Sequence, residues 1–160
     1  MSSDCCGWEQ VSCNSTTGHI VGLSLNHITD TTNWLLNVSL FRPFKELTSL
    51  DLSGNQIGGC IANEESLFNI SIFFTFLNIF FSYLLEILDM SGNRFTGSIS
   101  PYIGALSLTK DILLSDNNFN GAFLLKHNTH PSFNITVSTY HPGKVSHITL
   151  NFSDISTIEL

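Results

Sequence analysis

Four histidines in the last third of the chain have the spacing that comes closest to a metal site. His127 and His130 form an H-x-x-H pair, and His141 and His147 follow. A zinc site needs several ligands held together, and neither a cysteine nor a carboxylate cluster joins these side chains. They are therefore interpreted as solvated loop histidines, and the sequence predicts no metal site and no cofactor.

The sequence also lacks the residue patterns that catalysis requires. It contains no G-x-S-x-G nucleophile turn and no phosphate-binding glycine loop. The adjacent carboxylates Glu64 and Glu65 flank a long apolar run, and they are interpreted as a solvated boundary and not as a general acid–base pair. The sequence thus predicts a protein that is not an enzyme, with no catalytic residues.

Composition and charge restrict the class of protein further. The 160 residues are enough for one domain. Only 12% of the residues are charged, and most of the polar surface comes from 21 Ser, 14 Thr and 15 Asn. The net charge of −7, with six Lys and Arg, excludes nucleic acid as a partner because phosphate binding requires clustered cations. The 42% of hydrophobic residues excludes a disordered chain.

One sequence frame occurs three times along the chain. The segments 47–59, 85–97 and 109–121 align without gaps on L-x-x-L-x-L-x-x-N-x-[IF]-x-G, and only Thr109 departs from the apolar pattern. This frame is typical of leucine-rich repeats. Because no single repeat can bury its apolar side alone, the coils are expected to stack into an α/β solenoid.

Two weaker copies of the frame flank these three. Residues 20–25 fit the strand portion, with Ile28 in place of the Asn. Residues 145–150 fit it as well, with Ser153 at the Asn position. They are interpreted as further strands of the solenoid, at its first coil and near its C-terminal end.

The strand portion of each repeat alternates between core and solvent. Leu50 and Leu52 are expected to face the core, and the residues beside them to face solvent. Stacking would align the solvent-facing residues in columns, which form a neutral-to-acidic binding surface suited to hydrogen bonds with peptides or sugars. The predicted binding residues are Ser49, Asp51, Ser53, Ile87, Asp89, Ser91, Asp111, Leu113 and Ser115.

The Asn of each frame ends its strand on the inside of a turn. There its amide is expected to satisfy backbone groups of its own turn and of the next coil, as buried backbone requires. The sequence therefore predicts a structural ladder of Asn55, Asn93 and Asn117.

The N-terminal segment carries a specific pattern of cysteine and tryptophan. Residues 5–13 match C-C-x-W-x-x-V-x-C, which resembles the N-terminal cap of plant extracellular leucine-rich-repeat proteins. The segment 39–60 resembles the first repeats of plant receptor-like proteins. This resemblance implies a right-handed horseshoe with short parallel strands on its concave face. It also implies a non-enzymatic recognition function in plant signalling or defence, in which that face binds a peptide, protein or glycan ligand and a co-receptor.

The resemblance extends to the cysteines. It implies a disulfide between Cys6 and Cys13, with Trp8 packed over the edge of the first coil. In the family, the residue that matches Cys5 pairs with a cysteine further upstream; here a bridge from Cys5 to Cys60 is arithmetically possible. A metal site at the three N-terminal cysteines is an alternative, although the C-x6-C spacing is not the usual one for zinc.

The segment 66–85 does not fit the repeat pattern. It carries no charge and holds six of the 13 Phe residues. Three interpretations are open: a membrane-spanning helix over 67–85, a degenerate repeat, or a foreign stretch such as a translated intron. In the degenerate repeat the strand would contain Leu67, Ile70 and Ile72.

The sequence thus predicts three parts. Residues 1–25 form a partial N-terminal cap, and residues 26–121 form the repeats with an apolar insertion at about 66–85. Residues 122–160 form a degenerate repeat or an irregular segment. Within that last part, 134–140 and 145–150 alternate like strands around a turn at 142–143, so a hairpin is the other possibility.

Sequons and cysteines indicate an extracellular or plasma-membrane protein. No signal peptide is recognisable, and the family's C-terminal membrane anchor is expected to lie in a missing segment, so a truncated, non-functional gene product is one alternative. Two others are a secreted inhibitor of cell-wall-degrading enzymes and a small membrane protein that spans through 67–85. The predicted glycosylation sites are Asn14, Asn37, Asn69, Asn134 and Asn151.

Overall fold

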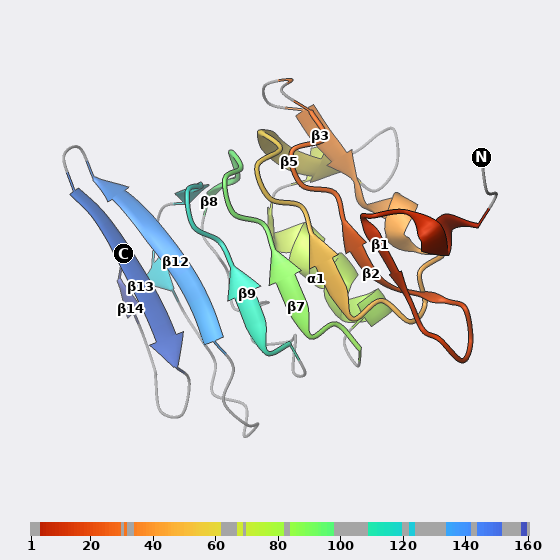
Figure 1. Ribbon diagram of the computed structural model, residues 1–160. Coiled ribbons are helices and arrows are strands. Elements are labelled where there is room, and N and C mark those ends of the chain that lie inside the picture. The colour runs from red at the N-terminus through yellow and green to blue at the C-terminus, as the bar shows by residue number, and fades with distance from the viewer. Residues whose placement is uncertain are drawn as a thin grey trace.

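The computed structural model of the chain describes residues 4–29, 31, 34–61, 67–68, 70–81, 84–97, 109–119, 122–123, 134–141, 144–151 and 158–159. Its main element is a seven-stranded sheet in the order β1-β2-β4-β7-β9-β12-β13 (Figure 1). The five inner strands are parallel neighbours, while β1 and β13 pair antiparallel at the two edges. The strands are β1 Val11–Cys13, β2 Ile20–Ser24, β4 Ser49–Asp51, β7 Ile87–Asp89, β9 Asp111–Leu113, β12 Asn134–His141 and β13 Lys144–Asn151.

Each framed repeat contributes one strand in the same register. Leu50 pairs with Leu88 and Leu88 with Ile112, and all three side chains are at most 1% exposed. The second apolar position of the frame is also buried and is filled by Leu52, Met90 and Leu114. Alternation within a strand therefore places two apolar residues of every coil in the core. This arrangement confirms the predicted stacking of the repeats.

A second layer lies behind the main sheet. It contains a three-stranded sheet in the order β3-β5-β6 and the helix α1, Ile70–Phe81. The remaining elements are short: two 3-10 helices and two strand pairs, β8 with β10 and β11 with β14. Their bounds are β3 Trp34–Asn37, β5 Ile57–Ile61, β6 Leu67–Phe68, η1 Cys5–Gly7, η2 Val38–Phe41, β8 Thr96–Gly97, β10 Asn118–Phe119, β11 Ala122–Phe123 and β14 Ile158–Glu159.

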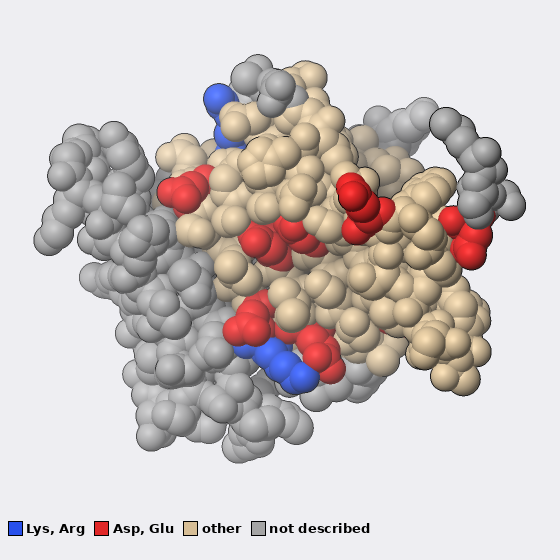
Figure 2. All heavy atoms as spheres, viewed as in Figure 1, with Lys and Arg blue, Asp and Glu red and all other residues tan. Residues whose placement is uncertain are grey.

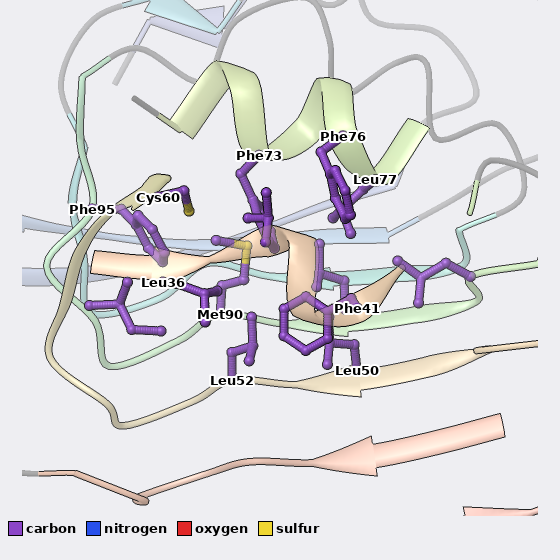
Figure 3. Packing of buried hydrophobic residues seen from close by; sticks show 14 of the residues in the cluster. Leu36, Phe41, Leu50, Leu52, Cys60, Phe73, Phe76, Leu77, Met90 and Phe95 are labelled. Atoms are coloured by element: carbon purple, nitrogen blue, oxygen red, sulfur yellow. The ribbon is translucent and has the colours of Figure 1, made fainter. Parts of the chain in front are cut away.

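The hydrophobic core fills the space between the two layers. Figure 3 shows Phe73, Phe76 and Leu77 directed from α1 toward the cluster, with Leu50 and Leu52 on its other side. The three α1 side chains are at most 6% exposed. The helix is therefore part of the same core as the repeats.

The helix corrects two of the interpretations of the apolar run. Its 12 residues span only about 18 Å at 1.5 Å per residue. Among the described residues, no helix has both the length and the apolar character to cross a membrane. The degenerate-repeat interpretation is wrong as well, because Ile70 and Ile72 lie in α1 and not in a strand. Only Leu67 of the expected strand lies in one, the two-residue β6.

The C-terminal part contains the hairpin, and the first strand of the hairpin extends the parallel stack. β12 takes the next place in the repeat stack, since it pairs in parallel with β9. β13 then turns back and pairs antiparallel with β12 over eight residue pairs. The weaker repeat copy expected at 145–150 is thus a strand, but its direction is opposite to that of a repeat strand. Two of the four histidines, His141 and His147, lie in these strands and not in loops.

Candidate functional site

The asparagine ladder holds the turns that follow the strands. Nδ2 of Asn93 donates to the carbonyl oxygens of Met90 in its own coil and Leu52 in the preceding coil, at 2.9 Å each. Its Oδ1 accepts from the backbone N–H groups of Asn55 at 3.3 Å and Ile57 at 3.0 Å. One buried side chain thus satisfies backbone groups of two coils.

The direction of the ladder differs from the expectation. Each Asn bonds to the preceding coil: Asn55 donates to the Leu25 carbonyl at 2.6 Å, and Asn117 accepts from Phe95 N–H at 3.1 Å. This explains why Ile28 can replace the Asn in the first coil. The Ile28 N–H donates to Oδ1 of Asn55 at 2.8 Å. The Asn of the second coil therefore provides the hydrogen bond that an Asn in the first coil would otherwise make.

The turn before each ladder position requires a left-handed backbone. The residue preceding the ladder position has a φ of 49° at His27, 67° at Gly54, 63° at Gly92 and 53° at Asp116. At Gly54, an added Cβ would also lie 2.5 Å from Nε2 of His27. Glycine therefore serves there both for its conformational freedom and for the close approach of the histidine ring.

The nine predicted binding residues lie on one surface, which we call the strand face. The register pairs Ser49 with Ile87 and Asp51 with Asp89, and it continues from these to β9. The strand face comprises Ser49, Asp51, Ser53, Ile87, Asp89, Ser91, Asp111, Leu113 and Ser115, all of them half-exposed or exposed. The structure thus brings the predicted columns together, while their role in binding stays a prediction.

The carboxylates of the strand face are held by hydroxyl groups. The Ser53 hydroxyl donates to Oδ1 of Asp51 at 2.7 Å, and the Ser91 hydroxyl donates to Oδ1 of Asp89 at 2.6 Å. In each pair the serine N–H donates to the same oxygen. These contacts fix the aspartate side chains before any ligand arrives, which lowers the entropy lost on binding.

Two residues of the first coil extend the strand face beyond the predicted set. Ser24 pairs with Asp51, and its hydroxyl donates to Oδ2 of that carboxylate at 2.8 Å. Nδ2 of Asn26 donates to the same oxygen at 2.9 Å. The weak repeat copy at 20–25 contained the signal for both, because it places Ser24 and Asn26 level with Asp51 and Ser53 of the next coil.

These contacts change the acidity of Asp51. Partial burial of its carboxylate raises the pKa, but hydrogen bonds from Ser53, Ser24 and Asn26 outweigh this effect, so the pKa lies below its ordinary value. The contribution to stability is therefore complete above about pH 4 and is lost as the pH falls through the lowered pKa of the folded state.

We expect Asp51→Asn to remove this dependence on pH. At about pH 6 the variant should be less stable than the parent, and the difference should shrink as the pH falls through the lowered pKa of Asp51, because the carboxylate then becomes neutral. Urea denaturation of the two proteins across this range measures the effect. A difference in stability that stays constant over the whole range would contradict it.

The charge of the strand face is mainly negative. Figure 2, which has the same view as Figure 1, shows acidic side chains gathered over the central strands, with basic side chains beside some of them. Glu86 and Lys110 form an ion pair at 2.7 Å next to this surface. Ile87, which is 41% exposed, adds an apolar side chain among the carboxylates. The surface therefore presents hydrogen-bond acceptors together with the apolar side chains of Ile87 and Leu113.

The N-terminal cap contains the implied disulfide between Cys6 and Cys13. The metal-site alternative is therefore wrong, because sulfur atoms in a disulfide are not thiolate ligands. Cys5 and Cys60 are both free, and Cys60 is fully buried, which raises the pKa of its thiol. The expected packing of Trp8 is also wrong, since that side chain is 60% exposed.

A polar contact joins the cap to the first framed repeat. Nδ1 of His19 lies 2.6 Å from Oε1 of Glu46, and the Thr17 hydroxyl donates to Oε2 at 3.0 Å. The hydrogen bonds with His19 and Thr17 lower the pKa of Glu46. The turn between β1 and β2 is thereby tied to the segment that precedes β4.

Several predicted positions cannot be placed. Asn69, His127, His130, Glu64 and Glu65 lie outside the described residues, as does Ser153. Asn134 and Asn151 face each other across the β12–β13 hairpin, and only their backbone is described. The remaining two sequon asparagines, Asn14 and Asn37, are half-exposed.

Comparison with known proteins identifies the repeat type. Residues 84–106 and 46–59 match two family models, each described as a leucine-rich repeat. The chain therefore carries leucine-rich repeats. It is similar to the receptor-like proteins of Arabidopsis thaliana, in agreement with the resemblance of its N-terminal cap.

The similarity covers most of the chain but a small part of the relatives. Receptor-like protein 9a is 36% identical over 124 residues, which is 78% of this leucine-rich-repeat chain and 12% of the relative. Receptor-like protein 9b is 39% identical over 127 residues, again 78% of the chain and 12% of the relative. A chain in the crystal structure of the Arabidopsis BIR3–SERK2 complex has a TM-score of 0.55 and 26% identity, over 89% of this chain and 71% of that one.

Proposed function

We propose that the strand face is the recognition surface of a cell-surface receptor-like ectodomain, which acts by binding in plant signalling or defence and not by catalysis. The observation that carries the proposal is the register of the parallel strands, which aligns outward-facing side chains of successive repeats on one surface. The similarity to receptor-like proteins supports it as well. The location that goes with this function is the extracellular side of the plasma membrane.

The proposal includes finer features of shape and organisation. The coils wind in a right-handed horseshoe, and the strand face is its concave side. Residues 1–25 act as the cap, 26–121 as the recognition repeats and 122–160 as a closing segment.

The chemistry of the strand face suggests what a ligand must offer. Carboxylates held by serine hydroxyls accept hydrogen bonds from peptide N–H groups, ammonium or guanidinium groups, or sugar hydroxyls. Ile87, 41% exposed, provides a contact for a small apolar side chain. A peptide, protein or glycan ligand of neutral or basic character therefore fits this surface, together with a co-receptor.

A co-receptor interaction can be tested with the proteins of the similar structure. The full chain is immobilised, and the extracellular parts of SERK2 and BIR3 serve as probes in biolayer interferometry. We expect one of them to bind, and Ile87→Arg and Asp89→Arg to weaken that binding by about tenfold or more, as for central interface residues. The matched control is Ile79→Arg on α1, a position that is 69% exposed and remote from the strand face.

The outcome separates recognition by the strand face from the other possibilities. Binding that Ile79→Arg weakens and the strand-face variants do not would move the recognition surface to the helix layer. Absence of binding to both probes, with capture of a purified cell-wall-degrading enzyme in a parallel measurement, would replace the receptor function by that of an inhibitor. Unchanged thermal unfolding of each variant is required before its binding is interpreted.

A further inference from the structure

The outer side of the second sheet exposes apolar side chains. In β3, Leu36 faces the core and is 2% exposed, whereas the alternation of the strand places Leu35 and Asn37 outward. Leu35 is 38% exposed. Leu40 in the following 3-10 helix is 62% exposed. Large exposed apolar patches mark surfaces that are covered by a partner or another group, and these two leucines lie on the same side of the second layer.

Asn37 lies at the centre of this surface. It shares the outward side of β3 with Leu35 and pairs across the sheet with Ile61, which is half-exposed. It is also the N-cap residue of η2, the short helix that contains Leu40. We call Leu35, Leu40 and Ile61 the back-sheet strip.

The amide of Asn37 is oriented by its own sequon. Its Oδ1 accepts from the Ser39 N–H at 3.0 Å and from the Ser39 hydroxyl at 2.7 Å. No described residue accepts a hydrogen bond from Nδ2 of Asn37. Among the described residues, every buried polar side-chain atom has a hydrogen-bond partner, so Nδ2 is not one of the buried atoms. Nδ2 therefore faces solvent, which is the arrangement that a substituent on this nitrogen needs.

We propose that Asn37 carries an N-linked glycan and that this glycan covers the back-sheet strip. In the transfer, a bond forms between Nδ2 of Asn37 and the anomeric carbon of an oligosaccharide carried on a polyprenyl diphosphate. The bond from that carbon to the diphosphate oxygen breaks, Nδ2 loses one proton, and the polyprenyl diphosphate leaves. The apolar faces of the sugar rings then lie over Leu35, Leu40 and Ile61, and the hydroxyl groups face water.

Other asparagines of the chain provide the contrast. Asn14 also lies in a sequon and uses its Oδ1 to accept from Thr16 N–H at 2.8 Å, but its neighbours from 15 to 17 are exposed and polar. A glycan there would cover no apolar strip. The ladder residues Asn55 and Asn93 belong to no sequon, and their amide groups donate to backbone carbonyls inside the protein. Of the two sequon asparagines whose side chains the structure describes, Asn37 is the one that lies beside exposed leucines.

The first measurement is occupancy. The full chain is secreted from plant cells behind an added signal peptide, and its peptides are mapped by mass spectrometry after enzymatic deglycosylation in heavy-oxygen water. We expect the peptide with Asn37 to show conversion of that residue to labelled aspartate. A secreted, folded chain whose Asn37 is unmodified would overturn the proposal.

The second measurement tests the covering role. Asn37→Asp cannot be glycosylated but keeps the oxygen that accepts from Ser39, so η2 retains its cap. We expect this variant to bind a hydrophobic fluorescent dye roughly twofold more strongly than the parent, and Asn37→Asp combined with Leu40→Ser to return to the parental value.

The matched control is Asn14→Asp, which removes a glycan from polar surroundings and should leave dye binding unchanged. Equal dye binding by the parent and Asn37→Asp would overturn the covering role. An equal increase in Asn14→Asp would do the same, because it would show a general effect of lost glycan. Because the strip lies on the layer opposite the strand face, loss of this glycan should leave SERK2 or BIR3 binding unaltered, so the two proposals can fail separately.

Discussion

Asn93→Ala is expected to lower the free energy of unfolding by about 3–5 kcal/mol, because two buried N–H groups lose their acceptor and two buried carbonyls lose one of their donors. The amide of Asn93 donates to the carbonyls of Leu52 and Met90 and accepts from the N–H groups of Asn55 and Ile57. The Asn side chain is only 6% exposed, so water cannot easily replace these bonds. Alanine leaves both donors and both carbonyls without the amide that joins the two coils.

Urea denaturation followed by tryptophan fluorescence measures this effect. Trp34 is a suitable probe because its indole Nε1 donates to the Asn55 carbonyl at 2.6 Å, next to the ladder. The control is Asn118→Ala, at an exposed position of β10, which should change stability by less than about 0.5 kcal/mol. If both variants unfolded at the same urea concentration, the ladder would contribute nothing beyond an ordinary surface asparagine.

The repeats were predictable because each of their features is local. Alternation fixes which residues of Ser49–Asp51 face the core, and the Asn frame fixes where the strand turns. Stacking identical frames then aligns the columns without further information. Even the direction of the ladder bonds could be anticipated from Ile28, since a first coil without an Asn is possible only if the second coil supplies the amide.

The predictions that were wrong concern features that depend on contacts between residues distant in sequence. Alternating residues at 145–150 suit an antiparallel strand as well as a parallel one, so the direction of β13 depends on its partner β12. Trp8 matches the cap pattern, but its side chain finds no cover and stays exposed. Whether a tryptophan packs on an edge depends on neighbours distant in sequence.

The helix α1 had a local signal that the hydropathy of the run concealed. Its core-facing residues follow the spacing of one helical face: Phe73, Phe76 and Leu77 are buried, and Phe80 is partly buried. The polar residues at positions 71, 75 and 78 follow the spacing of the opposite face. High mean hydropathy over 66–85 is compatible with a membrane-spanning helix. The periodicity instead indicates a short helix with one face in a core.

Phe73→Ala is expected to lower the free energy of unfolding by about 3–5 kcal/mol, as for other large side chains in well-packed cores. The Phe73 side chain is fully buried. Its ring lies 6.4 Å from that of Phe95, centre to centre, and Phe95 lies 6.4 Å from Phe119. The substitution would thus open a cavity at one end of a row of rings that joins α1 to the second and third framed repeats.

The control on the same helix is Ile79→Ala, at a position that is 69% exposed, and it should change stability by less than about 0.5 kcal/mol. Both variants place alanine in α1, so helix propensity cannot produce the difference between them. Chemical denaturation of the parent and the two variants gives the comparison. If Phe73→Ala were as stable as Ile79→Ala, α1 would not belong to the repeat core, and the repeats on either side of 66–85 would have to stack without it.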